Sequence, residues 1–305
     1  MIHNNTLIAL GSALLACLIW SGNFVIARSV HEWIPPFTLA FGRWTVALFA
    51  LLPFSLMVLK REWQIVTSHL RYLFFMGFIG VAGFNTLIYL AAHTTTVNHI
   101  AIISAATPIF TLLIAGLVGE EKLSRYPVYG AALACIGALT VINHGDISVL
   151  FKQTWRPGDI LALIAALIWA GWSVGLRFKP AGMSAITLMT TAMIFGLLGL
   201  MPFYGWEIQA HTVDLSLWQV WSVFLYVGIA ASLIAWLLWQ YSVEKIGSVK
   251  TSLIYYTIPI FSSIFAALFL DESIEIYHFV GFILVFAGIV TSNMRRPTKA
   301  AYPPR

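Results

Sequence analysis

Apolar residues occur in long runs along the chain, and short segments with charges, proline or glycine separate these runs. A helix needs about 20 consecutive apolar residues to cross a membrane, and the runs predict ten such helices. They are expected near residues 7–27, 37–59, 72–92, 98–118, 127–143, 159–177, 184–204, 218–240, 250–270 and 277–294. A backbone in lipid must satisfy its own hydrogen bonds, and the runs do not alternate as barrel strands do. The pattern therefore predicts an all-α integral membrane protein with ten transmembrane helices.

The composition excludes a soluble globular protein. Of the 305 residues, 60% are hydrophobic and 10% are charged, and the mean hydropathy is +0.87. Soluble domains carry roughly 25% charged residues. The net charge of +5 comes from residues between the apolar runs, so it indicates membrane topology and not a nucleic-acid partner. We expect the lipid bilayer and a small-molecule substrate as partners, and a monomeric protein.

The basic residues predict the orientation, because lysine and arginine are enriched on the cytoplasmic side. With a cytoplasmic N-terminus, thirteen of the 17 basic residues are cytoplasmic, three are outside, and Arg43 lies within a span. The thirteen are Lys60, Arg61, Arg71, Lys122, Arg125, Arg177, Lys179, Lys245, Lys250, Arg295, Arg296, Lys299 and Arg305. We therefore expect both termini in the cytoplasm. The short loops and compact size are typical of a multi-pass protein of a bacterial inner (plasma) membrane.

The two halves of the chain resemble each other at an offset of about 150 residues. The matches, in order, are Trp20 with Trp169, Gly22 with Gly171, Arg28 with Arg177, Pro53-Phe54 with Pro202-Phe203, Pro108-Ile109-Phe110 with Pro259-Ile260-Phe261, Glu120-Glu121 with Asp271-Glu272, Gly130 with Gly281 and Gly137 with Gly288. We expect a first five-helix repeat at 1–145, a connecting loop at 146–157, a second five-helix repeat at 158–296 and a cytoplasmic tail at 297–305.

Five spans per half require the second half to enter the membrane from the opposite side. The loop charges agree, because Lys122 and Arg125 follow the fourth span, whereas the segment after the ninth is acidic. The loop after the second span holds three basic residues, whereas its counterpart after the seventh holds Glu207 and Asp214. Two inverted repeats with a site at their interface are an architecture of secondary transporters.

Several motifs resemble those of the drug/metabolite transporter superfamily, EamA branch. The string from Leu18 to Val25 followed by Arg28 is similar to the signature of the first helix. Thr107-Pro108-Ile109-Phe110 and Ile258-Pro259-Ile260-Phe261 are similar to the pattern of the fourth helix in each copy. The resemblance covers nearly the whole chain. It implies two inverted five-helix halves, a central cavity lined by helices 1, 3, 4, 6, 8 and 9, and export of small metabolites, often amino acids.

Arg43 stands out because, of all the Asp, Glu, Lys and Arg residues, it alone is expected in the interior of a span. A charge there is costly and is a functional hypothesis by default. The guanidinium could attract a substrate carboxylate. It could equally make a structural contact with backbone carbonyls or a tryptophan face, or extend towards the membrane surface.

Other polar or aromatic side chains on the expected spans are candidates for substrate binding. Pairs four residues apart share a helix face, as Asn85 does with Tyr89 and Trp169 with Ser173. The full set is Trp20, Asn23, Arg43, Asn85, Tyr89, Ser104, Trp169, Ser173, Trp239, Tyr255 and Tyr256. For the tryptophans, packing between helices is the competing interpretation. For Ser104 it is a hydrogen bond to its own helix.

Pro108 and Pro259 are expected in mid-helix, where proline removes a hydrogen bond and kinks the helix. Paired kinks could be hinges of alternating access or could simply shape the cavity. The span interiors hold no Asp or Glu, so we expect facilitated diffusion or exchange. Proton coupling through His99 or Glu244 near a helix end is the alternative.

The sequence contains no P-loop, no metal-ligand spacing and no hydrolase motif, so we expect no cofactor, no metal and no enzyme activity. The leading prediction is an exporter of amino acids or related amphipathic compounds that works by alternating access. A drug or nucleobase-type exporter of the same architecture is the alternative. A membrane-embedded enzyme and a sensor are rivals from other classes.

Overall fold

The computed structural model describes residues 2–30, 33–120, 125–146, 148–152, 154–211, 213–269 and 273–293, and these residues form no β-strand. The first half contains α1 (Ile2–Val30), α2 (Pro36–Arg61), α3 (Trp63–Ser68), α4 (Leu70–Phe75), η1 (Met76–Phe84), α5 (Asn85–Ala92), α6 (Val97–Ser104), α7 (Thr107–Leu117) and α8 (Arg125–Ile142). The second half contains α9 (Val149–Lys152), α10 (Pro157–Gly175), η2 (Leu176–Phe178), α11 (Ala185–Ala210), α12 (Trp218–Leu225), η3 (Tyr226–Ile234), α13 (Ala235–Ile246), α14 (Ser248–Ile254), η4 (Tyr255–Thr257), α15 (Ile258–Phe269) and α16 (Ile276–Asn293).

Eight helical segments of the described chain are long and apolar enough to cross a membrane. They are Asn5–Asn23, Pro36–Arg61, Leu70–Ala92, His99–Leu117, Arg125–Ile142, Pro157–Phe178, Ala185–Ala210 and Trp218–Ile246. These eight correspond to the first eight expected spans. The ninth expected span falls on α14 and α15, which η4 divides, and the tenth falls on α16, whose apolar part is a shorter helix.

The outer surface of the bundle is apolar. Large side chains such as Phe54, Met57 and Leu117 are more than two-thirds exposed. A soluble protein rarely leaves extended apolar surface in water. The exposed rings and aliphatic chains therefore fit a lipid environment, as the composition predicts.

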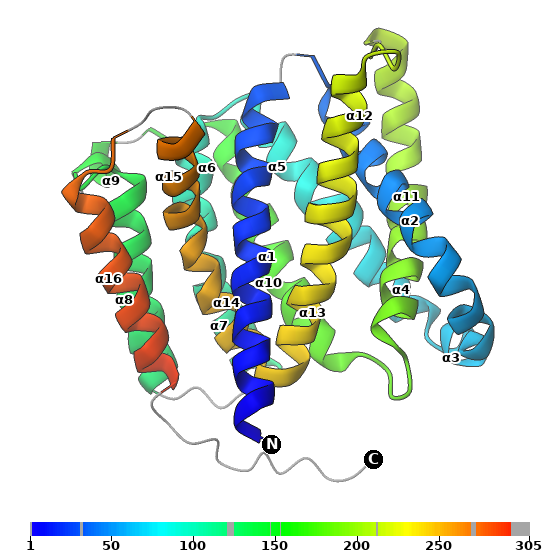
Figure 1. Ribbon diagram of the computed structural model, residues 1–305, viewed down its shortest axis with the longest axis horizontal. Coiled ribbons are helices and arrows are strands. Elements are labelled where there is room, and N and C mark those ends of the chain that lie inside the picture. The colour runs from blue at the N-terminus through cyan, green and yellow to red at the C-terminus, as the bar shows by residue number, and fades with distance from the viewer. Residues whose placement is uncertain are drawn as a thin grey trace.

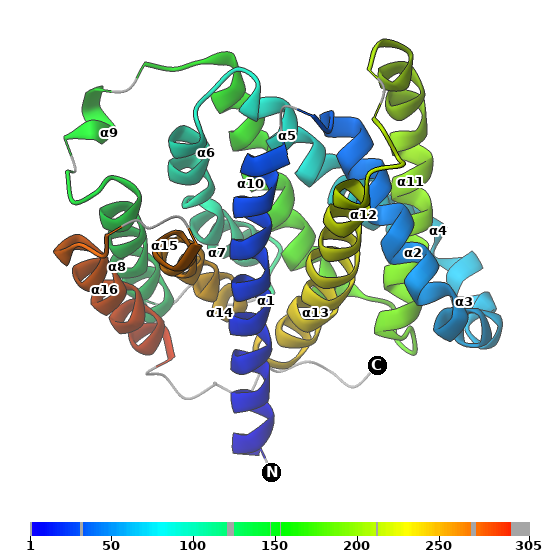
Figure 2. The same ribbon diagram turned by 45° about the horizontal axis from the view of Figure 1, so that its top comes forward.

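Helices of the two halves pack against each other throughout the bundle (Figure 1). α1 packs on α13 and α15, and α10 packs on η1, α5 and α7. α2 packs on α11 on one side of the bundle, and α8 packs on α16 on the other. Turning the view brings α1, α10 and α13 into the middle, between these two outer pairs (Figure 2). The core therefore lies between the halves.

The α8 and α16 helices approach closely because glycines face each other. A Cβ atom at Gly137 would lie 2.7 Å from the carbonyl oxygen of Gly281, and one at Gly130 would lie 2.6 Å from that of Gly288. Small residues let helix backbones approach in membranes. The later residue of α8 meets the earlier residue of α16, so the two helices run antiparallel.

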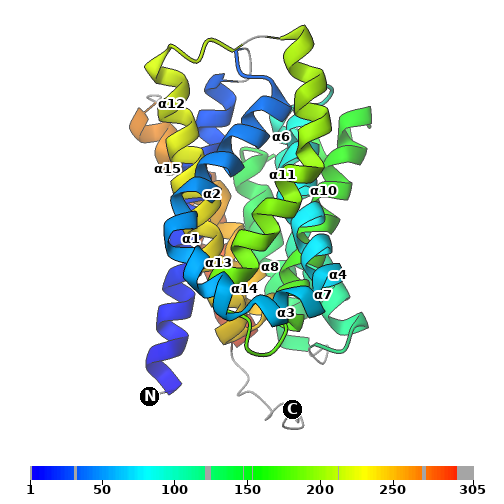
Figure 3. The ribbon, with the colours of Figure 1, turned by 90° about the vertical axis from the view of Figure 1, so that its right-hand side faces the viewer.

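Irregular helical turns occur at matching places in both halves. The segments η1 and η3 are both π-helical, each has nine residues, and Met76 and Tyr226 begin them. α2 and α11 each contain an internal proline, Pro53 and Pro202. α2 crosses the bundle obliquely beside α11 (Figure 3).

The prolines expected in mid-helix are instead close to the start of a helical segment. Pro108 is the second residue of α7, and a turn at Ala105 and Ala106 separates α7 from α6. Pro259 is the second residue of α15, directly after the 3₁₀ turn of η4. A proline in the first turn leaves no hydrogen bond unmade, so the chain breaks ahead of it and does not kink around it. The hinge role of both residues stays a prediction.

The glycine contacts predict a stability difference between two alanine variants. Gly137→Ala would press a methyl group into the backbone of α16, and we expect a loss of about 1–3 kcal/mol in the free energy of unfolding. Gly205→Ala is the control, because nothing lies within 4 Å of a Cβ there, and a helical alanine gains about 0.5–1 kcal/mol over glycine. Thermal unfolding in detergent measures both. Wild-type stability of Gly137→Ala would contradict the close packing of α8 on α16.

Candidate functional site

Arg43 lies buried at the junction of three helical segments. Its side chain projects from α2 and the residue is 1% exposed. Its Nε atom donates to the hydroxyl of Ser232 in η3 at 2.7 Å. Its Nη1 atom donates to Asn85 Oδ1 at 3.0 Å and to the hydroxyl of Tyr89 at 2.8 Å, both in α5. The arginine thus ties α2, α5 and η3 together.

The partners of Arg43 are all neutral. Within the described residues, the ion pairs join other groups, and no acidic side chain pairs with this guanidinium. A guanidinium has donors only and stays charged in proteins. The centre of the bundle therefore holds a positive charge whose hydrogen bonds are partly satisfied and whose charge is not balanced.

The π-helical turn of η3 positions two of the groups around this charge. The hydroxyl of Ser232 donates to the carbonyl of Val227 at 2.7 Å, five residues earlier, and so keeps its lone pairs for Arg43. The carbonyl of Ala231, one residue before, accepts a hydrogen bond from Trp20 Nε1 at 2.9 Å. Single π-helical turns often occur at functional sites because they expose backbone groups.

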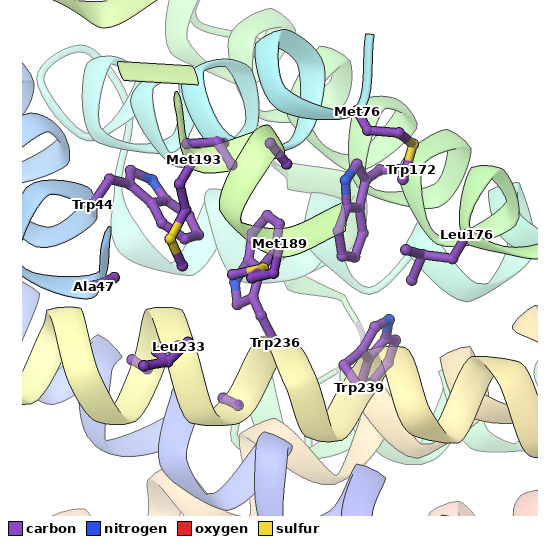
Figure 4. Packing of buried hydrophobic residues seen from close by; sticks show 14 of the residues in the cluster. Trp44, Ala47, Met76, Trp172, Leu176, Met189, Met193, Leu233, Trp236 and Trp239 are labelled. Carbon is purple, nitrogen blue, oxygen red and sulfur yellow. The ribbon is translucent and has the colours of Figure 1, made fainter. Parts of the chain in front are cut away.

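A chain of indole rings extends from Arg43 through the centre of the molecule. The guanidinium carbon lies 5.3 Å from the centroid of Trp44. From there the centroid distances are 4.8 Å from Trp44 to Trp236, 4.3 Å from Trp236 to Trp172, and 5.1 Å from Trp172 to Trp169. Figure 4 shows Trp236 and Trp239 pointing from α13 towards the helices that carry Met189 and Trp172. Aromatic pairs at these distances stabilise a core beyond their buried area.

The predicted ring residues from both halves meet in the same cluster. Trp20 lies 5.3 Å from Trp169 and 5.2 Å from Trp239 between ring centroids, and 6.4 Å from Tyr255. The Nε1 atom of Trp239 donates to the hydroxyl of Ser173 at 3.2 Å. The structure therefore brings together Trp20, Trp169, Ser173, Trp239 and Tyr255 as one group and Arg43, Asn85 and Tyr89 as a second, linked group.

Three predicted residues stand apart from these two groups. Tyr256 packs in a separate apolar cluster with Leu253 and Ile260, next to α8. Ser104 is half-buried at the end of α6. Asn23 is buried, and its Oδ1 atom has no hydrogen-bond partner among the described residues.

Four central residues lie outside the predicted set: Trp44, Trp172, Ser232 and Trp236. Spacing along the helix could have found two of the three tryptophans, because Trp172 and Trp236 lie three residues from Trp169 and Trp239 and share their helix faces. Ser232 has no local signal, because its role depends on the π-helical turn and on a contact across 189 residues.

Charged groups close one end of the bundle. Arg177 Nε forms a 3.1 Å ion pair with Glu120 Oε1, and its Nη1 atom donates to the backbone carbonyl of Glu244 at 3.0 Å. Lys179 forms an ion pair with the Glu244 carboxylate. Glu120 also accepts hydrogen bonds from the backbone and hydroxyl of Ser248. These contacts link the ends of α7, α10 and α13 with the start of α14.

Buried acids occupy the opposite end. Glu207 was expected in a loop, but it lies in the last turn of α11, where it caps α2 by accepting from the backbone of Phe37 at 3.1 Å and of Thr38 at 2.6 Å. Asp159, in the first turn of α10, lies 3.1 Å from His99 Nδ1. Of the two residues considered for proton coupling, His99 thus lies within hydrogen-bond distance of Asp159, and Glu244 pairs with Lys179. The described residues contain no group of three or more His, Cys, Asp or Glu that could hold a metal ion.

The apolar helices indicate a multi-pass membrane protein, and comparison with known proteins identifies its family. The sequence model of the EamA-like transporter family matches the chain twice, at residues 7–143 and 156–294. A crystal structure superposes with a TM-score of 0.73 at 18% identity, covering 94% of this chain and 96% of that one. These findings identify a multi-pass helical membrane transporter. The chain belongs to the EamA-like transporter family.

Relatives with transporter names match at low identity. The uncharacterized transporter YetK of Bacillus subtilis (strain 168) is 23% identical over 288 residues, which is 94% of this chain and 87% of YetK. An uncharacterized transporter of Archaeoglobus fulgidus is 26% identical, with 92% and 96% of the two chains covered. A riboflavin transporter of Brucella anthropi is 28% identical over 193 residues, 61% of this chain and 64% of its own.

The contact between Ser232 and Arg43 predicts a stability loss. Ser232→Ala removes the acceptor for Nε and leaves a buried charged donor unpaired, which costs about 1–3 kcal/mol. Ser263→Ala is the matched control, because its hydroxyl donates only to the carbonyl of Pro259 in its own helix. We expect a lower unfolding temperature for Ser232→Ala than for Ser263→Ala in detergent. Equal temperatures would show that Ser232 does not hold Arg43.

Proposed function

We propose that this protein is a secondary transporter that exports small organic solutes across the plasma membrane by alternating access. The observation that carries the proposal is the buried guanidinium of Arg43, which neutral groups of both halves hold in the middle of the bundle. Such a charge is expensive inside a membrane protein and marks a pathway or a binding site. The transporter names of the relatives support a carrier and give no support to an enzyme.

We propose that ten helices form two inverted repeats, with the boundaries expected from the sequence. The pattern of contacts supports this, because α1 on α13 and α15 has its counterpart in α10 on α5 and α7. Equivalent helices α8 and α16 run antiparallel through glycines that occupy equivalent places. An axis in the membrane plane relates two halves in this way.

Both termini are proposed to be cytoplasmic, in a bacterial inner membrane. The distribution of lysine and arginine supports this orientation. It places the network of Glu120, Arg177 and Glu244 at the cytoplasmic end. Alternating access then requires these ion pairs to open while the other end closes. We propose a monomer, because the two halves already supply both sides of the central site.

The centre supports exchange or facilitated diffusion as the transport mode. Among the residues that the structure describes, buried acidic side chains such as those of Asp159 and Glu207 lie at helix ends and not beside Arg43. A proton relay of the usual kind needs ionisable groups along the path. The substrate proposed here is a small amphipathic compound with a carboxylate, such as an amino acid, whose apolar part would contact the indole rings. Because a riboflavin transporter of Brucella anthropi is among the similar proteins, a larger ring compound is the alternative substrate.

Counterflow in proteoliposomes tests the proposed function. We expect vesicles preloaded with a mixture of amino acids and aromatic carboxylates to accumulate at least one labelled member of that mixture. Arg43→Lys keeps the charge but loses the fork that holds Ser232 and Asn85, so we expect it to reduce the initial rate by about tenfold or more. Protein-free liposomes are the control. No accumulation by folded protein for any compound would contradict the proposal.

A further inference from the structure

The centre of the bundle contains buried hydrogen-bond donors that have no partner among the residues that the structure describes. They are the indole N–H groups of Trp44, Trp169 and Trp172 and the Nδ2 group of Asn85, each in a residue that is at least nine-tenths buried. Buried polar groups in proteins are nearly always paired, and each exception needs an explanation. Neighbouring ring faces are only weak acceptors, so the edge-on ring contacts do not replace the missing bonds.

The chemical identity of these donors is fixed. An indole nitrogen donates and does not accept. The amide of Asn85 can turn only one way, because Arg43 is a donor and must face its oxygen, at 3.0 Å. The nitrogen of that amide is therefore the unpaired atom.

The residues that carry the unpaired donors are connected by a series of contacts that begins at Arg43. Asn85 bonds to the guanidinium directly, and the ring of Trp44 follows Arg43 in sequence and in space. The ring of Trp236 contacts both Trp44 and Trp172. Figure 4 shows Trp44 and Trp172 on either side of Trp236. One small molecule that displaces these rings would meet several of the donors together.

The unpaired acceptors of the described residues carry no negative charge. They are the amide oxygens of Asn23 and Asn143 and the hydroxyls of Thr45, Thr86 and Tyr256. The buried carboxylates of Glu120, Asp159 and Glu207 are already bonded at the two ends of the bundle. An ammonium ion at the centre would therefore meet the positive charge of Arg43 without a carboxylate to balance it.

We propose that the site is selective for aromatic organic anions that lack an ammonium group, such as arylalkyl carboxylates, over the corresponding zwitterionic amino acids. The carboxylate would take the charge of Arg43 and the unpaired N–H groups, and the ring would stack among the indoles. This inference rests on the proposed transport function. It keeps the carboxylate-bearing substrate class proposed above but favours members without an ammonium group over the amino acids named there.

Three compounds with the same ring and chain test the inference. They are 3-phenylpropionate, phenylalanine and phenethylamine, which are an anion, a zwitterion and a cation. We expect purified wild-type protein to bind labelled 3-phenylpropionate about tenfold or more tightly than phenylalanine, and phenethylamine most weakly. Counterflow in proteoliposomes should follow the same order.

A charge substitution reverses the expected preference. Asn85→Asp keeps an oxygen facing Arg43, removes the unpaired donor and balances the positive charge. We expect it to lose about tenfold in affinity for 3-phenylpropionate and to gain affinity for phenylalanine relative to wild type. Asn143→Asp makes the same chemical change outside the ring cluster and should keep the wild-type order. Thermal unfolding of each variant shows that the protein is folded, and the gain for phenylalanine cannot arise from misfolding.

The outcomes separate the two claims. Binding and counterflow of phenylalanine at least equal to those of 3-phenylpropionate would overturn the selectivity and leave the transport function intact. An unchanged order in Asn85→Asp would overturn it as well. Failure of folded protein to carry any of the three compounds or the mixed amino acids would overturn the proposed function itself.

Discussion

A single buried cation determines the arrangement of the centre of this protein. Arg43 cannot reach water, and it is held by Ser232, Asn85 and Tyr89. Each of these partners needs its own backbone placement, which comes from the π-helical turn of η3 and from the start of α5. Together with the packing of α2 on α11 and η3, this side chain holds α2 against α5 and η3.

The scaffold is repeated, but its charged centre is built once. Both halves contain a nine-residue π-helical segment, and in both halves a long helix earlier in the chain, α2 or α11, contains an internal proline. The counterparts of Arg43 and Ser232, however, are Ala192 and Ala82. Matching helices suit a movement that exchanges the two ends, whereas a single guanidinium fits the one substrate site per chain that we propose. Trp20 and Trp169 occupy equivalent places in the two halves but differ in their contacts. Trp20 donates to the carbonyl of Ala231, whereas Trp169 Nε1 has no partner among the described residues.

The sequence predicts the parts of this structure that depend on local composition. Apolar runs predict the helices, and a charge in such a run identifies Arg43. Spacing of four residues identifies Asn85 with Tyr89. The π-helical turns escape prediction because an extra residue in a turn leaves no compositional mark. The cap that Glu207 provides for α2 escapes it because the contact spans 169 residues. The sequence predicts Pro108 and Pro259 in mid-helix because both lie inside continuous apolar runs, and the break ahead of each proline leaves no mark in that apolar pattern.

The most direct test is whether the centre becomes accessible from each side of the membrane in turn. Ser173 is 1% exposed and bonds to Trp239, so a cysteine there reports opening of the ring cluster. Ser173→Cys, in protein with Cys17 and Cys135 replaced by alanine, is exposed to an impermeant maleimide from one side and then from the other. The account predicts labelling from both sides during counterflow, without leakage of a small ion. Labelling from one side alone, or protection from both during active counterflow, would contradict alternating access through this centre.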